Sequence, residues 1–126
     1  MNDRFKFRAW LIDEKRYGEN INLFNCCNDT IYDVEEYDDK GSHYTMYRAD
    51  EVVLEQCTGL KDENGKLIYE GDIILVEDNK CPIEWESFNA RYNVVGYGEI
   101  AYLNYNDIEV IGNIHENADL LEVKND

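Results

Sequence analysis

The most constraining feature of this sequence is the stretch from Cys57 to Asp78, CTGLKDENGKLIYEGDIILVED. Its polar run 62–66 contains Asn64-Gly65, a dipeptide that tolerates the positive φ angles of tight hairpin turns. The apolar, β-branched run 73–76 is bounded by charged residues, and its length and composition are typical of a buried strand. The stretch therefore predicts a β-hairpin followed by another strand, and it contains no catalytic signature.

Further strands are predicted on both sides of this stretch. Residues 4–12 alternate basic with aromatic or apolar side chains, and this period of two indicates a half-buried strand. The segment 50–56 fits either a strand or a helix, and the hairpin that follows it favours a strand. The other predicted strands are short runs bounded by glycine or charged residues: 21–24, 45–47, 66–69, 73–77, 81–85, 91–95, 98–103 and 108–114.

We predict a mostly β protein, with an α+β fold as the alternative, because strands recur about every ten residues with glycine between them. A small N-terminal β region is expected over 1–56, and an SH3-like or otherwise bent β-barrel over 57–126. A helical turn or an acidic loop is expected near 31–39, and a helical turn capped by Asn117 over 117–122. The side chains expected to be largely buried are Trp10, Leu60, Ile73, Leu75, Trp85, Val110 and Ile114.

Three segments carry a family resemblance. They are Phe5–Trp10 (FKFRAW), Cys57–Ile73 (CTGLKDENGKLIYEGDI) and Ile108–Asn117 (IEVIGNIHEN). In this order they resemble the opening, central and closing motifs of the YopX family of phage and prophage proteins. The resemblance implies a phage or prophage origin, and it implies no established activity, catalytic residue or cofactor. Residues 20–44 match none of these motifs.

The chain is strongly acidic, with 28 acidic and 12 basic residues and a formal charge of −16. This charge argues against general binding to nucleic acid, because phosphates would be repelled. It permits binding to a basic protein surface, and it equally serves solubility alone. The candidate acidic interaction surface consists of the acids that cluster in one stretch: Asp29, Asp33, Glu35, Glu36, Asp38 and Asp39.

Tyrosine is abundant, with ten residues in the chain. Tyrosine suits interfaces because it buries a large area and keeps a polar tip, and an ordinary place in the core or at its rim is an equal alternative. The candidate aromatic contact residues are Tyr97, Tyr102 and Tyr105. Exposed strand edges also favour self-association, so we expect a homo-oligomer.

The sequence contains no phosphate-binding loop, nucleophile elbow or clustered metal ligands. His43 and His115 have no cysteine or histidine at ligand spacing, and Glu84 and Glu86 flank Trp85. These two glutamates suit either a divalent cation or, as the preferred interpretation, a solvated strand face with Trp85 pointing inward. We predict no enzyme activity, no catalytic or metal-binding residue and no cofactor. The four cysteines, expected to be reduced and mostly buried, are Cys26, Cys27, Cys57 and Cys81.

No apolar run is long enough to span a membrane, and residues 1–4 lack the features of a signal peptide, so we expect a protein of the bacterial host's cytoplasm. The functional hypothesis is a non-enzymatic protein-binding module. Its specific form is an acidic inhibitor of a host nucleic-acid-binding protein, in which carboxylates imitate phosphates. The alternatives are a structural or accessory phage protein that acts by self-assembly, and a metal-dependent nuclease-like enzyme.

Overall fold

The computed structural model describes residues 6–24, 33–41, 43–87 and 89–122. Within these residues the protein is mostly β, which confirms the predicted fold class, and the helices are 3-10 turns of three or four residues. The chain divides into two compact units. The N-terminal unit is Phe7–Glu55, and the C-terminal unit is Gln56–Asp126 together with Met1–Lys6.

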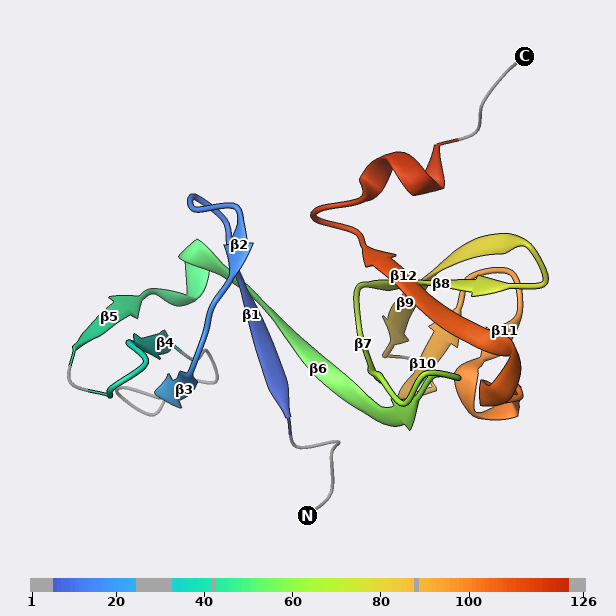
Figure 1. Ribbon diagram of the computed structural model, residues 1–126, viewed down its shortest axis with the longest axis horizontal. Coiled ribbons are helices and arrows are strands. Elements are labelled where there is room, and N and C mark those ends of the chain that lie inside the picture. Colours follow the sequence, from blue (N-terminus) through green and yellow to red (C-terminus); the bar gives the residue numbers. More distant parts are fainter. Residues whose placement is uncertain (1–5, 25–32, 42, 88, 123–126) are drawn as a thin grey trace. The chain divides into compact units, whose positions relative to one another are not determined.

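The N-terminal unit contains two antiparallel groups of strands (Figure 1). In the first group, β1 (Phe7–Leu11) pairs with β2 (Arg16–Tyr17). The second is a three-stranded sheet in the order β3-β4-β5, so that β5 lies at an edge. Its strands are β3 (Ile21–Phe24), β4 (Asp33–Tyr37) and β5 (Tyr44–Tyr47). The core of this unit consists of Ala9, Leu11, Val34 and Val52.

The helical turn predicted near 31–39 is wrong for the described part of that range, where 33–37 forms β4. Along a strand, side chains alternate between faces, so Val34 and Glu36 share one face. Val34 is fully buried, and Glu36 is held by Arg16 at 2.7 Å. These tertiary contacts favour the strand over a helix. Ile31, at the start of the predicted range, lies outside the described residues.

The C-terminal unit is built around a five-stranded antiparallel sheet in the order β11-β10-β9-β8-β12. The sheet curls into a half-barrel, which confirms the prediction of a bent β-barrel (Figure 1). Its strands are β8 (Asp72–Val76), β9 (Asn79–Glu86), β10 (Arg91–Val94), β11 (Gly98–Glu99) and β12 (Ile108–Asn113).

A long strand, β6 (Val52–Lys61), begins in the N-terminal unit and ends in the C-terminal unit. Its second half pairs with β7 (Leu67–Tyr69), and the register shifts between Cys57 and Lys61. The 3-10 turns are η2 (Ala49–Glu51), η3 (Ile100–Tyr102), η4 (Tyr105–Asp107) and η5 (Ala118–Leu121).

A compact apolar core fills the C-terminal unit. Burying each aliphatic side chain of this kind contributes about 1.5–3 kcal/mol. Branched side chains dominate because they pack well against neighbours on the pleated surface of a sheet. The buried members of the core are Ile68, Ile74, Val76, Cys81, Ile83, Val94, Ile100 and Ile108.

The predicted burial is confirmed for Trp10 and Ile73, which are 7% and 0% exposed. Leu60, Leu75 and Val110 are half-buried. The prediction is wrong for Trp85, which is 46% exposed, and for Ile114, which is 39% exposed. Both residues lie at or just beyond the end of a strand, where the core ends before the apolar pattern does.

Two details at the C-terminal end of the chain differ from the prediction. Only Gly98–Glu99 of the segment 98–103 is a strand, because the chain then tightens into η3, where the Leu103 N–H donates to the Ile100 carbonyl at 3.0 Å. The predicted turn over 117–122 is confirmed as η5. The Asn117 side chain does not cap it, because its Oδ1 accepts a hydrogen bond from the Asn113 N–H.

Candidate functional site

The turn at 62–66 is organised by the carboxylate of Asp62. Its Oδ1 accepts hydrogen bonds from the N–H groups of Asn64 and Lys66, each at 2.9 Å, and its Oδ2 accepts one from the Val110 N–H at 2.9 Å. Gly65 adopts a φ of +79°, which the Asn-Gly dipeptide makes accessible. Burial raises the pKa of Asp62, but the three backbone donors together outweigh burial and leave the pKa below its ordinary value.

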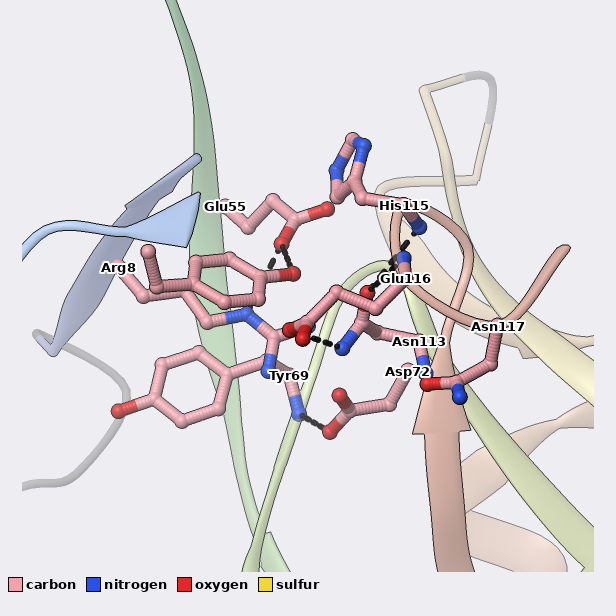
Figure 2. Close-up of polar contacts among 9 residues, drawn as sticks. Arg8, Glu55, Tyr69, Asp72, Asn113, His115, Glu116 and Asn117 are labelled. Carbon is pink, nitrogen blue, oxygen red and sulfur yellow. Dashed lines mark hydrogen bonds and ion pairs between the residues drawn. The ribbon is translucent and has the colours of Figure 1, made fainter. Parts of the chain in front are cut away.

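A second buried carboxylate organises the chain between β7 and β8. Asp72 is 1% exposed, and its Oδ2 accepts a hydrogen bond from the Tyr69 N–H at 2.8 Å (Figure 2). Gly71 between them donates its N–H to the Ile83 carbonyl, and its own carbonyl accepts from the Ile114 N–H at 2.9 Å. These contacts hold the entry to β8 against the end of β12.

Asparagines close the segment that follows β12. Asn113 Oδ1 accepts from the N–H groups of His115 and Glu116 at 3.1 and 2.9 Å, and the Asn113 N–H donates to Asn117 Oδ1 at 3.1 Å (Figure 2). A Cβ atom on Gly112 would lie 2.6 Å from Asn117 Oδ1, so any larger residue there would have to displace the Asn117 side chain. We name the hydrogen-bonded pairing of segments 62–72 and 108–117 the motif clamp. The most distinctive sequence motifs therefore have a structural role.

The acidic pair on β9 is not arranged as a cation site. The Glu86 carboxylate accepts hydrogen bonds from Arg91 Nε at 2.9 Å, from Asn89 Nδ2 at 2.6 Å and from Asn93 Nδ2. Arg91, followed by the two asparagines, lowers the pKa of Glu86. Glu84 is exposed, and no group of three or more Asp, Glu, His or Cys side chains in the described residues could hold a metal ion.

Trp85, which was expected to point inward, lines an open groove in the C-terminal unit. By strand alternation it shares a face with the buried Ile83, but it sits at the end of β9, where it is 46% exposed. Its ring packs edge-on against Tyr92, with 4.9 Å between centroids. The groove has a volume of about 530 Å³, and Leu60 and Ile100 also line it. The feature that accounts for the exposure of Trp85 is the turn that begins two residues later, because β9 ends there.

The candidate acidic residues are divided between two faces of the three-stranded sheet. Glu36 lies on the same face as Val34, and both of its carboxylate oxygens accept hydrogen bonds from Arg16 at 2.7 Å. These bonds are the main reason that the pKa of Glu36 is lowered. The other face carries Asp33 and Glu35, which accept from the Ala49 N–H at 3.0 Å and from the Tyr37 hydroxyl at 2.6 Å.

The turn after β4 brings two more acids to the surface. Asp38 and Asp39 are both exposed; Asp38 accepts from the Lys40 N–H at 3.1 Å and lies 3.2 Å from His43 Nδ1. Asp29 lies outside the described residues. The structure therefore exposes Asp38 and Asp39, whereas Glu35 is half-buried beside Tyr37 and Glu36 is half-buried and paired with Arg16.

The candidate aromatic residues have different settings. Tyr97 packs against the core, and its hydroxyl accepts from Asn79 Nδ2 at 2.8 Å, so it holds the turn between β8 and β9. Tyr102 is 84% exposed and directly follows Ala101, which lines the groove. Tyr105 opens η4, and its side chain lies outside the described part of the structure.

The described cysteines, Cys57 and Cys81, are both buried, and burial raises the pKa of Cys81. Cys26 and Cys27 lie outside the described residues. Across the described segments, no helix combines the length and the apolar character that a membrane crossing requires.

Comparisons with known proteins give the chain its family. The sequence matches no curated protein. The crystal structure of protein EF1440 from Enterococcus faecalis is similar, with 26% sequence identity, a TM-score of 0.65, and coverage of 93% of this chain and 97% of that one. The family model described as YopX protein matches residues 6–122, which include the motif clamp. The chain therefore belongs to the YopX family.

Proposed function

We propose that this protein is a non-enzymatic protein-binding module, encoded by a phage or prophage, whose partner has a basic surface. The observation that carries the proposal is how three of the five arginines are used. Arg8, Arg16 and Arg91 each form an ion pair within the protein, with Glu55, Glu36 and Glu86. These cations are offset internally, so the excess of 28 acids over 12 bases is expressed mainly as carboxylates that face solvent.

The internal pairing is tightest at Glu55, which is 2% exposed. Its Oε1 accepts from Arg8 Nε at 2.9 Å and from the Tyr17 hydroxyl at 2.8 Å (Figure 2), and the Arg8 guanidinium lies 4.5 Å from the centre of the Tyr17 ring. An arginine held in this way contributes to the fold and is unsuited to gripping a phosphate. The proposal therefore places nucleic acid on the partner, with no direct contact to this chain.

The specific form of the proposal is an inhibitor that occupies the basic groove of a host nucleic-acid-binding protein. Asp38 and Asp39 supply exposed carboxylates, and the half-buried Glu35 adds a third from the same stretch of the N-terminal unit. Separated carboxylates can imitate phosphates, and attraction between opposite charges raises association rates steeply at low salt. The hydrogen bonds of Glu35 and Asp38 to Tyr37 and Lys40 hold these groups in defined positions.

A second function, self-assembly as an accessory protein, is favoured by the edge strand β5. Tyr44 and Met46 are 62% and 42% exposed, and among the described residues β5 has a strand neighbour on one side only, β4. An unpaired strand edge with exposed apolar side chains is a template for pairing with another copy. The negative charge opposes this association, so salt should strengthen it.

The test of the main proposal is capture of a partner at different salt concentrations. The tagged protein is incubated with nuclease-treated host lysate, and the double variant Glu35→Gln, Asp39→Asn is compared with the control Asp107→Asn, Glu122→Gln, which removes the same charge from the exposed surface of the C-terminal unit. Glu36 is left unchanged because its substitution would break the Arg16 pair.

The expected result is a basic, nucleic-acid-binding protein that is retained by the wild type and the control. Salt, added DNA or RNA, and the Glu35/Asp39 double variant should each release it. Retention that is equal in both double variants, or a partner that nucleic acid does not displace, would refute the inhibitor form. Recovery of only the protein's own untagged copies would support self-assembly instead.

A further inference from the structure

The groove at the end of β9 has the construction of a binding surface. Trp85 is 46% exposed and is supported edge-on by Tyr92, while Leu60 and Ile100 supply apolar lining behind them. Its volume of about 530 Å³ falls within the range of roughly 300–1,000 Å³ that is usual for ligand sites. A half-exposed tryptophan in a concave apolar setting is also the residue type most enriched among energetic anchors of interfaces.

One wall of the groove is formed by the irregular part of β6. Thr58 Oγ1 donates to the Ile68 carbonyl at 2.8 Å and accepts from the Leu60 N–H at 3.1 Å, and the Gly59 N–H points to Cys57 Sγ at 3.4 Å. Because these N–H groups are already occupied, the wall does not offer a ladder to an added strand. A ligand here is recognised by its side chains.

The polar groups around the groove favour a cation. Glu99 lines it. Burial, and to a smaller extent the negative charge of Glu70, raises the pKa of Tyr92, so the Tyr92 phenol stays neutral. The guanidinium of Arg91 also lines the groove, but its charge is offset by Glu86 at 2.9 Å. The aromatic face of Trp85 adds a further preference for a cation, worth more for tryptophan than for the other aromatic residues.

We propose that this groove binds an extended peptide segment of a partner protein in which an arginine or lysine neighbours an apolar residue. The cationic group lies over Trp85 and near Glu99, and the apolar side chain packs on Leu60 and Ile100. The proposal rests on the proposed function as a protein-binding module and names the chemistry of the segment that it takes. The charge of −16 then steers such a segment toward the protein.

The test uses a short, end-blocked peptide that alternates arginine and leucine, titrated into the whole protein labelled with ¹⁵N. The protein has two tryptophans, and Trp10 is 7% exposed in the N-terminal unit, so two indole N–H signals report separately. The Trp85 signal should shift and saturate while the Trp10 signal stays in place. Peptides that alternate glutamate and leucine, or proline and leucine, should shift it much less.

Variants separate the contributions. Trp85→Ala should weaken binding about tenfold or more, Trp85→Leu nearly as much, and Trp85→Phe clearly less, because only phenylalanine keeps an aromatic face. Glu99→Gln should weaken binding a few-fold and reduce its dependence on salt. Tyr44→Ala, which removes an exposed aromatic ring from the N-terminal unit, is the matched control and should bind as the wild type does.

An unmoved Trp85 signal, equal binding of the glutamate peptide, or full binding by Trp85→Leu would overturn the proposal. Preference for the proline peptide would identify a neutral polyproline-type ligand and also overturn it. The two proposals fail separately. If Trp85→Ala still captures the basic partner and the Glu35/Asp39 variant does not, the groove proposal is wrong and the proposed function stands; if the wild type captures no basic partner and binds no peptide, both are wrong.

Discussion

The carboxylate of Asp62 accepts a hydrogen bond from the Val110 N–H at 2.9 Å, although the two residues are 48 positions apart in the chain. The same carboxylate closes its own turn through Asn64 and Lys66. One buried side chain therefore sets a local hairpin turn and also fixes that turn against β12. This double role explains why the central and closing motifs occur together in one chain.

Asp62→Asn should destabilise the protein by about 2–3 kcal/mol, because hydrogen bonds to a charged acceptor are lost and the amide group places a donor near a backbone N–H. Urea unfolding of the C-terminal unit, followed by Tyr and Trp fluorescence, measures the free energy of unfolding. Glu63→Gln is the control: Glu63 is an exposed neighbour whose backbone N–H alone contacts Ile108. Equal stability of the two variants would mean that Asp62 does not organise the motif clamp.

Gly112→Ala should destabilise the protein by about 1–3 kcal/mol, because the new Cβ would lie 2.6–2.9 Å from the side chain of Asn117. In an Asn117→Gly background the same substitution should cost markedly less, since the colliding atoms are gone. A double-mutant cycle measures the coupling between the two positions. Strict additivity of the two substitutions would contradict the contact.

The Arg16–Glu36 ion pair makes stability depend on pH in a defined direction. The pKa of Glu36 is lowered in the folded protein below its ordinary value of 4.5, chiefly by Arg16, so the folded state binds fewer protons than the unfolded state. This contribution is complete above pH 4.5 and is lost as the pH falls through the lowered pKa. It amounts to about 1 kcal/mol, because Arg16 is 43% exposed and the pair is screened by solvent.

The measurement is the difference in unfolding free energy between the wild type and Glu36→Gln as a function of pH. The difference should be constant near neutral pH and should shrink toward zero in acid. Glu122→Gln, an exposed substitution of the same kind, should show no such trend. A difference that grows as the pH falls would contradict the direction assigned to the pKa.

The exposed edge of β5 predicts a homo-oligomer. Light scattering at moderate salt should give a mass above 14.8 kDa, and Met46→Lys should return the protein toward that value by placing a charge on the edge. Val53→Lys is the control, because Val53 is 37% exposed and lies in β6, away from the β5 edge. A wild-type mass near 14.8 kDa at all salt concentrations would rule out this prediction.

The local rules that the sequence displays most strongly predict the C-terminal unit well. The Asn64-Gly65 turn and the apolar run of β8 are recognisable because they depend on backbone preference and on a period of two. The strand at 33–37 is not apparent from the local pattern, because Ile31, Val34 and Tyr37 are spaced by three residues, as on one face of a helix. What decides the outcome is Arg16, which lies 20 residues from Glu36 and whose partner cannot be read from local pattern.

The groove could be predicted only in part. The alternation around Trp85 correctly places its side chain on the face of Ile83, but exposure depends on where the strand ends and on what lies opposite. Leu60 and Ile100, which line the groove, come from two other segments of the chain. No single stretch of sequence contains the groove. From sequence alone, Trp85 and Tyr92 therefore look like ordinary core residues.

The motif clamp and the groove use different side chains of the same unit. Asp62, Asp72 and Asn113 hold backbone groups in place, whereas the exposed groove residues Trp85, Ala90 and Ala101 are outside that network. Substitutions in the groove should consequently change what is recognised while leaving the folding free energy almost intact. The C-terminal unit thus has the properties of a scaffold, on which new specificities can be selected by varying the groove while the clamp is kept unchanged.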